Sequence, residues 1–185
     1  MSRQSRKPKR VIWIGCEGES EVSYVGLLKI LIAEKNLPFH LFSANLGSGA
    51  GDALARVDLA IRKLDHFKIT REKPHKSFML LDTDQNHATP DRYEMAKAKA
   101  LGKQITILWQ DPCFEGLILR HLENCSTRRP PDANTANTDL KRQWPEYTKA
   151  MSAQQLRKRL DQSSLCQVAQ VEPEFRNFFQ ALGII

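Results

Sequence analysis

The sequence of 185 residues lacks the features that mark membrane, secreted and zinc-binding proteins. No apolar run approaches the roughly 18 residues of a membrane-spanning helix. The basic N-terminus leads into only about six apolar residues, fewer than the roughly 7–15 of a signal peptide. The four cysteines form no Cys-x-x-Cys pair, which argues against a zinc ribbon and a disulfide framework. We therefore expect a cytoplasmic protein with reduced thiols and no membrane partner.

Excess positive charge is scarce outside the first ten residues. The chain has 28 Lys and Arg against 21 Asp and Glu, a net charge of +7. Five of these charges belong to the N-terminal arm, which carries Arg3, Arg6, Lys7, Lys9 and Arg10. A basic arm can contact the phosphates of nucleic acid, and the alternative interpretation is a solvated tail without a ligand. The rest of the chain is nearly neutral.

What the sequence does contain is an alternation of short apolar runs with amphipathic stretches. The apolar runs predict strands at residues 11–16, 39–44, 77–81 and 104–109. Helical patterns follow each run, and Asp111-Pro112 is expected to open the fourth helix. Strands separated by helices favour a parallel sheet covered on both faces. We predict an α/β fold with a four-stranded parallel sheet in the order 2-1-3-4, flanked by helices.

The pattern loosens after residue 124. A polar loop is predicted over residues 128–137, followed by helices near 139–150, 152–162 and 172–182. We therefore divide the chain into a basic arm (1–10), an α/β domain (11–124) and a C-terminal helical extension (125–185). The length of 185 residues fits this organisation.

Acidic residues follow three of the four predicted strands. They are Glu17, Glu19 and Glu21 after the first, Asp82 and Asp84 after the third, and Glu115 after the fourth. In an open parallel sheet these strand ends meet at the edge where ligands bind. Clustered carboxylates repel one another unless a cation lies between them, and Mg²⁺ or Mn²⁺ prefers such oxygen ligands. For Glu21, Asp91 and Asp111 we favour the alternative of a helix cap or a solvated residue.

Four short motifs resemble those of known families. The segment Cys16-Glu17-Gly18-Glu19 and the later Asp82-Thr83-Asp84 are similar to the Glu and Asp-x-Asp motifs of the Toprim domain. The same two motifs, followed by Asp111-Pro-Cys-Phe-Glu115 and Tyr147-Thr-Lys149, resemble more closely the RloB-like family of bacterial proteins. This resemblance implies a Toprim-type metal site in a protein of phage defence, from abortive-infection or restriction–modification loci, with a partner such as an ATPase encoded nearby.

Our leading hypothesis is a metal-dependent nuclease, or a related phosphoryl-transfer enzyme, that acts on DNA or RNA. Asp82 and Asp84 would hold Mg²⁺ against the scissile phosphate, while Glu17 completes the metal shell or acts as general acid–base. Glu19 and Glu115 are further candidate ligands, and Lys149 would stabilise charge on the phosphate.

Two alternatives remain open. A non-catalytic sensor module would keep the acidic site for metal or nucleotide and act through a partner protein. A small-molecule phosphatase would hydrolyse a simple phosphomonoester and ignore polynucleotide.

Overall fold

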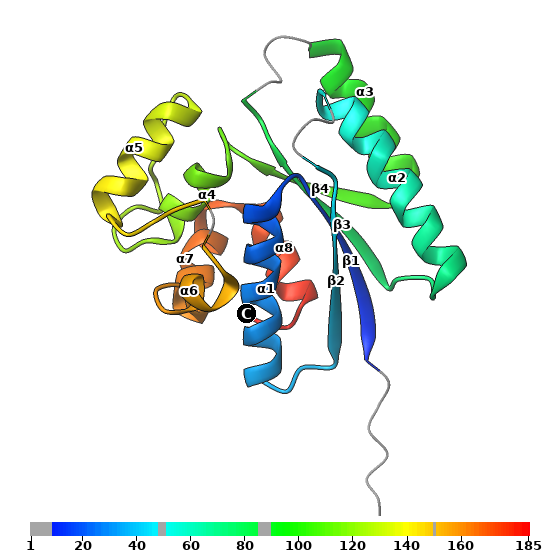
Figure 1. Ribbon diagram of the computed structural model, residues 1–185, viewed down its shortest axis with the longest axis horizontal. Coiled ribbons are helices and arrows are strands. Elements are labelled where there is room, and N and C mark those ends of the chain that lie inside the picture. The colour runs from blue at the N-terminus through cyan, green and yellow to red at the C-terminus, as the bar shows by residue number, and fades with distance from the viewer. Residues whose placement is uncertain (1–8, 48–50, 85–89, 150) are drawn as a thin grey trace, which may run out of the picture.

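Four parallel strands form the centre of the protein (Figure 1). The computed structural model describes residues 9–47, 51–84, 90–149 and 151–185. The strands are β1 (Arg10–Cys16), β2 (Phe39–Asn45), β3 (Lys76–Asp82) and β4 (Ile105–Gln110). They lie in the order β2-β1-β3-β4, and each pair is parallel. The fold class and the strand order predicted from the sequence are confirmed.

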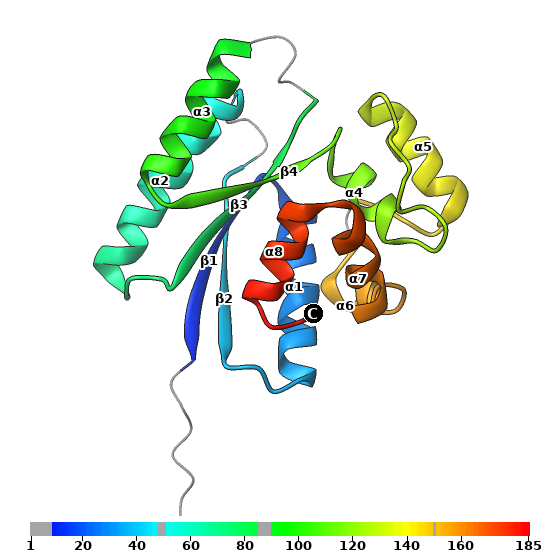
Figure 2. The same ribbon diagram turned by 180° about the vertical axis from the view of Figure 1, so that it is seen from behind.

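Helices cover both faces of the sheet (Figures 1 and 2). In the described residues they are α1 (Glu19–Glu34), α2 (Ala53–Thr70), α3 (Pro90–Gly102), α4 (Phe114–His121), α5 (Ala133–Gln143), α6 (Ala153–Arg157), α7 (Gln162–Val171) and α8 (Pro173–Ala181). Helices α2 and α3 lie on one face, and α1 with α8 lies on the other. Both hydrophobic faces of the parallel sheet are thus shielded from water by helices.

The described residues form two hydrophobic cores, one on each face of the sheet, and β1 contributes side chains to both. Ile12, Ile14 and Cys16 belong to the core shared with α1 and the C-terminal helices, whereas Trp13 belongs to the core beneath α2 and α3. Successive side chains of a strand point to opposite faces, so one apolar strand serves both cores. The helices after residue 125 contribute Leu140 and other buried side chains to the first core.

The register places the strand ends beside one another. Cys16, the last residue of β1, lies opposite Asn45 of β2 and Leu80 of β3. Asp82, the last residue of β3, lies opposite Gln110 of β4. The residue after β1 is therefore close to the end of β3, as the strand order requires.

Helix α4 begins later than the sequence pattern suggests. Asp111-Pro112 forms a cis peptide bond in a turn, and the helix starts at Phe114. Gly116 packs its Cα against this turn, where an added Cβ would lie 2.8 Å from the Asp111 carbonyl oxygen. The prediction that Asp111-Pro112 opens the helix was wrong, because that segment turns the chain from β4 toward α4.

The C-terminal helices also differ from the expected ones. The predicted polar loop ends early because Asp132 caps α5, accepting a hydrogen bond from the backbone N–H of Thr135. The helix expected over 152–162 divides into α6 and the start of α7, where Asp161 is the N-cap. Only two residues of α5 are buried. Its first turns therefore lack the hydrophobic periodicity from which helices are predicted, and the sequence pattern indicated a loop there.

No helix in the part of the chain that the structure describes combines the length and the apolar character needed to cross a membrane.

Candidate functional site

An acidic pocket lies at the carboxyl ends of β1 and β3, with a volume of about 190 Å³. It is lined by Glu17, Gly18, Ser20, Glu21, Arg56, Asp82, Phe114, Glu115 and Lys149. These residues come from the β1–α1 turn, the first turns of α1 and α2, the end of β3, the start of α4 and the segment after α5. We call this the acidic pocket.

Glu17 is held by two contacts. Its Oε1 lies 2.6 Å from Nη1 of Arg56, and its Oε2 accepts a hydrogen bond of 3.1 Å from the backbone N–H of Asp82. Arg56 is in turn fixed by its Nε, which donates to the carbonyl of Gly51. Burial raises the pKa of Glu17, although the Asp82 N–H and Arg56 act in the opposite direction. The carboxylate therefore has a fixed position between β3 and α2.

Glu21 has two roles. Its Oε2 accepts a hydrogen bond from the backbone N–H of Gly18, which caps α1 as the sequence indicates. The side chain is also buried and lines the acidic pocket. Burial, together with the charges of Glu17 and Glu115, raises its pKa to about 7.

Asp82 is the most strongly perturbed carboxyl group of the pocket. Burial raises its pKa to about 9, and the charges of Glu17, Glu21, Asp84 and Glu115 act in the same direction. With its amide oriented to satisfy both neighbours, the buried Gln110 donates to Asp82 Oδ1 (3.0 Å) and to Glu21 Oε1 (3.3 Å). A neutral amide cannot neutralise either carboxylate, so Asp82 takes up a proton at neutral pH when no cation is present.

Lys149 closes the pocket on the side of α4. Its Nζ lies 3.3 Å from Glu115 Oε1, and its carbonyl accepts a hydrogen bond from the Ser20 hydroxyl. Burial lowers the pKa of Lys149, but Glu115 outweighs this and the pKa is raised. The Lys149 side chain is 73% exposed, whereas that of Glu115 is only 5% exposed. The ammonium group therefore stands at the rim, where a ligand can meet it.

The thiols beside the pocket are poor nucleophiles. Cys113 donates from its Sγ to Glu115 Oε2, and burial raises its pKa to about 12. Burial also raises the pKa of Cys16 above its usual range. Only the thiolate is strongly nucleophilic, so the pocket does not favour cysteine chemistry.

The charges in the pocket do not balance. Its lining contains four carboxyl groups but only two cationic side chains, Arg56 on Glu17 and Lys149 on Glu115. Glu21 and Asp82 have no cationic partner among the described residues. When all groups are ionised, two negative charges are uncompensated, which is the charge of one divalent cation.

The structure brings together several of the residues singled out from the sequence. Glu17, Asp82, Glu115 and Lys149 meet in the acidic pocket. Asp84 is exposed and does not line the pocket, although its charge raises the pKa of Asp82.

Other candidates lie elsewhere. Glu19 is exposed, and its Oε1 accepts a hydrogen bond of 2.5 Å from Asn45 outside the pocket. Lys9 and Arg10 are at the opposite end of β1 (Figure 1). Arg3, Arg6 and Lys7 lie outside the described residues.

Two residues that line the pocket, Arg56 and Glu21, and one that contacts its carboxylates, Gln110, were not expected from the sequence as site residues. Arg56 belongs to the amphipathic helix α2, whose apolar stripe gave no indication of a partner for Glu17. Gln110 is an uncharged residue at the end of β4. Glu21 was interpreted as a cap alone. Its place in the first turn of a helix that begins directly after β1 was a usable signal, because that turn lies at the carboxyl edge of the sheet, where ligands bind.

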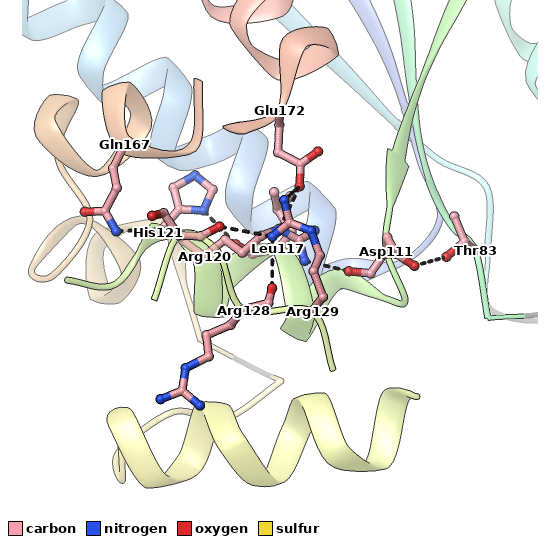
Figure 3. A network of polar contacts seen from close by, with 10 residues as sticks. Thr83, Asp111, Leu117, Arg120, His121, Arg128, Arg129, Gln167 and Glu172 are labelled. Atoms are coloured by element: carbon pink, nitrogen blue, oxygen red, sulfur yellow. Dashed lines mark hydrogen bonds and ion pairs between the residues drawn. The ribbon is translucent and has the colours of Figure 1, made fainter. Parts of the chain in front are cut away.

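A polar network contacts Thr83, the residue between Asp82 and Asp84 (Figure 3). The hydroxyl of Thr83 donates to Asp111 Oδ1 at 3.0 Å, and the backbone carbonyl of Asp111 accepts a hydrogen bond of 2.7 Å from Arg120 Nη1. Arg120 is fully buried, and its Nε lies 2.9 Å from Glu172 Oε1, which Arg129 also contacts. The network joins the end of β3 to the turn between α7 and α8.

The described residues do not form a complete protein cage for a metal. Among them, no group of three or more His, Cys, Asp and Glu side chains is arranged to hold an ion. Mg²⁺ is commonly bound by one or two carboxylates, with waters and substrate phosphates as its other ligands. The oxygen donors and the excess negative charge of the pocket fit such a partial set, but they do not fit the five-carboxylate set expected from the sequence.

Comparison with known proteins gives one match. The model of the RloB-like protein family matches residues 12–175, a span that includes every residue lining the acidic pocket. No curated protein and no solved structure matches significantly. Because the match covers most of the chain, the protein belongs to the RloB-like protein family.

Proposed function

We propose that the acidic pocket is the active site of a Mg²⁺- or Mn²⁺-dependent nuclease of Toprim type. The observation that carries the proposal is the pair of uncompensated carboxyl groups, Glu21 and Asp82, at the carboxyl edge of a parallel sheet. Ligands bind at this edge in open α/β sheets. A divalent cation would neutralise these charges, and its remaining ligands would be waters and the phosphate of a polynucleotide.

Asp82 would hold the ion, with Glu17 or Glu115 as its second protein ligand. When bound, the ion would supply charge stabilisation at the phosphate and a more acidic water. Asp84 stands at the exposed end of the same segment, where it is suited to a water-mediated contact. These assignments use only oxygen donors, which Mg²⁺ and Mn²⁺ prefer over the soft ligands of zinc.

The chain's own residues provide the rest of the chemistry. Arg56 and the Asp82 N–H orient Glu17. Where Glu115 is the second metal ligand, Glu17 would accept a proton from the attacking water. Lys149 can turn from Glu115 toward the phosphate because its side chain is mostly exposed. Its charge would then stabilise the negative charge that develops during phosphoryl transfer.

The biological setting is proposed from the family resemblance. We place this nuclease in phage defence in the cytoplasm, with a partner protein such as a nearby-encoded ATPase that controls cleavage. The N-terminal arm with its five basic residues would add phosphate contacts.

The test is cleavage of labelled single- and double-stranded DNA and RNA with Mg²⁺, Mn²⁺ or EDTA. We expect metal-dependent cleavage that Asp82→Ala and Glu17→Gln abolish. Glu19→Gln is the matched control, because Glu19 lies outside the pocket and its substitution should leave cleavage intact.

Two results would contradict the nuclease proposal. Metal binding without cleavage of any polynucleotide, with and without the partner ATPase, would indicate the non-catalytic sensor module. Hydrolysis of p-nitrophenyl phosphate without cleavage of polynucleotide would indicate a small-molecule phosphatase.

A further inference from the structure

A second groove, which we call the α2–β2 groove, lies between helix α2 and the edge strand β2. Its volume is about 500 Å³, and it shares no lining residue with the acidic pocket. It is lined by Phe42, Ala44, Arg62, Lys63, His66, Phe67, Thr70 and Arg71. Because β2 is an edge strand of the sheet, it has β1 on one side and no strand on the other.

The groove contains an aromatic pair. The rings of Phe42 and Phe67 lie 4.6 Å apart between centroids at an interplanar angle of 44°. The guanidinium carbon of Arg71 is 5.1 Å from the Phe42 centroid and 5.8 Å from that of Phe67. Phe67 is buried, whereas Phe42 on the edge strand is only partly buried. Arg71 lies over both rings and is exposed, so a planar ligand would stack on its guanidinium group and on the part of Phe42 that remains exposed.

The charge of the groove is of one sign. Arg62, Lys63 and Arg71 are exposed, and no Asp or Glu belongs to the lining. Lys63 donates to the backbone carbonyl of Asn45, and none of these three cations pairs with an acid among the described residues. A larger groove at the other end of β3 and β4 also has lysines, but its lining includes Glu174. The cationic side chains of the α2–β2 groove are thus complementary to an anion, while Phe42, Ala44 and Phe67 provide an apolar part of the lining.

We propose that the α2–β2 groove binds a single-stranded segment of nucleic acid, which rests on the proposed nuclease function and names its substrate class. Proteins that bind single strands combine cations along the phosphates with aromatic or arginine surfaces on which bases stack. The groove has both features. A duplex would meet only the cations, because its bases are already stacked on one another.

The position of the groove connects it to the acidic pocket. Helix α2 carries Arg56 in the pocket and Lys63 in the groove, seven residues apart, which corresponds to about 10 Å along a helix. Lys63 contacts the carbonyl of Asn45, and the side chain of Asn45 donates to Glu19 at the start of α1. A strand lying along α2 would therefore lead toward the acidic pocket.

The test measures binding of a fluorescein-labelled oligonucleotide of about 12 nucleotides, within the roughly 4–16-nucleotide sites of single-strand binders. Fluorescence anisotropy is recorded with the full chain in EDTA, which prevents metal-dependent cleavage. The probes are mixed-sequence single-stranded RNA and DNA, the matching duplexes, and an acidic peptide. Circular dichroism melting confirms that each variant is folded.

The first comparison reverses charge. Arg62→Glu with Lys63→Glu should weaken single-strand binding at least tenfold. It should also reduce the salt slope by about 1.4, the value for two phosphate contacts on a single strand. Lys141→Glu with Lys158→Glu is the matched control, because both lysines are exposed and lie on the C-terminal side of the molecule. The control should stay within twofold of the wild type.

The second comparison removes the ring. Phe42→Leu keeps an apolar side chain but cannot stack on a base. It should weaken binding of single strands about fivefold or more, which corresponds to the roughly 1 kcal/mol lower limit for base–aromatic stacking. Its effect on duplex binding should be below twofold.

Distinct results would overturn the inference. If the wild type binds single strands and both charge-reversed variants bind equally well or equally weakly, the groove is not the binding site, while the nuclease proposal stands. Unchanged single-strand binding by Phe42→Leu removes the stacking role, and tighter binding of the acidic peptide than of the oligonucleotides indicates a protein partner. If the wild type binds no single-stranded nucleic acid in EDTA, the groove inference fails, while the nuclease proposal is decided separately by the cleavage assay with Mg²⁺ or Mn²⁺.

Discussion

Two buried polar clusters flank the end of β3, and they differ in charge balance. In the cluster around Arg120, the guanidinium group contacts the Asp111 carbonyl and Glu172, so each buried charge has a partner (Figure 3). In the acidic pocket, Asp82 has only the amide of Gln110 and lies among other carboxylates. A balanced cluster can serve structure alone. An unbalanced one costs stability, and that cost indicates a ligand.

The largest effect is expected in the balanced cluster. Arg120→Met removes a fully buried cation and leaves Glu172 with only Arg129. Breaking a buried ion pair typically costs about 3–5 kcal/mol, so we expect a loss of about 3 kcal/mol in the free energy of unfolding, measured by urea denaturation. Arg142→Met is the control, because the exposed Arg142–Asp139 pair contributes about 0.5 kcal/mol or less. Equal losses in the two variants would contradict the structural role of Arg120.

A smaller effect depends on pH and concerns His121. Its Nδ1 lies 2.9 Å from the Leu117 carbonyl and its Nε2 lies 2.9 Å from the Tyr24 hydroxyl, and burial lowers its pKa to about 4. Between about pH 6.5 and 4 the unfolded state binds more protons than the folded state, so stability falls as the pH falls. We expect about 2–3 kcal/mol of stability to be lost across this window.

Urea denaturation at several pH values measures this loss. His121→Gln should flatten the pH dependence, because glutamine does not titrate. His40→Gln is the control, since His40 is exposed on β2 and its substitution should leave the slope unchanged. A wild-type slope that His121→Gln does not alter would show that other groups cause it.

The third and smallest effect concerns Asp82 in the acidic pocket, whose titration changes stability with pH in the direction opposite to that of His121. Burial raises the pKa of Asp82 to about 9. Between about pH 4 and 9 the folded state therefore binds more protons than the unfolded state, and stability falls as the pH rises. In EDTA, Asp82→Asn should stabilise the protein by about 1 kcal/mol at pH 8, because asparagine does not have to take up a proton on folding, and by less at pH 5, where protonation costs less. Asp84→Asn, at an exposed position, should change stability by less than about 0.5 kcal/mol. Destabilisation by Asp82→Asn at pH 8 would contradict the charge imbalance.

The unbalanced cluster was partly predictable from sequence. Glu17 and Asp82 follow strands that the alternating pattern places side by side, so their proximity follows from parallel pairing. Lys149 was expected near the pocket from the family resemblance, and its Nζ contacts Glu115. The ion pair between Arg56 and Glu17 could not be predicted, because it depends on how α2 is rotated about its axis when it packs on the sheet.

The balanced cluster was not predictable. The partners of Arg120 are Asp111, on the preceding turn, and Glu172, which is 52 residues later in the chain. No local pattern links such positions, and the helix containing Arg120 is distinguished in sequence only by its apolar residues. Packing of α7 and α8 against α4 creates the pair.

We propose that the acidic pocket binds one divalent cation through Asp82. Isothermal titration calorimetry of Mn²⁺ into the wild type, Asp82→Asn and Glu19→Gln tests it most directly. We predict about one ion per chain, with affinity at least tenfold weaker in Asp82→Asn, the size of effect that loss of a ligand or its supporting group produces. Glu19→Gln should bind as the wild type does. Equal affinity in the wild type and Asp82→Asn would contradict the claim.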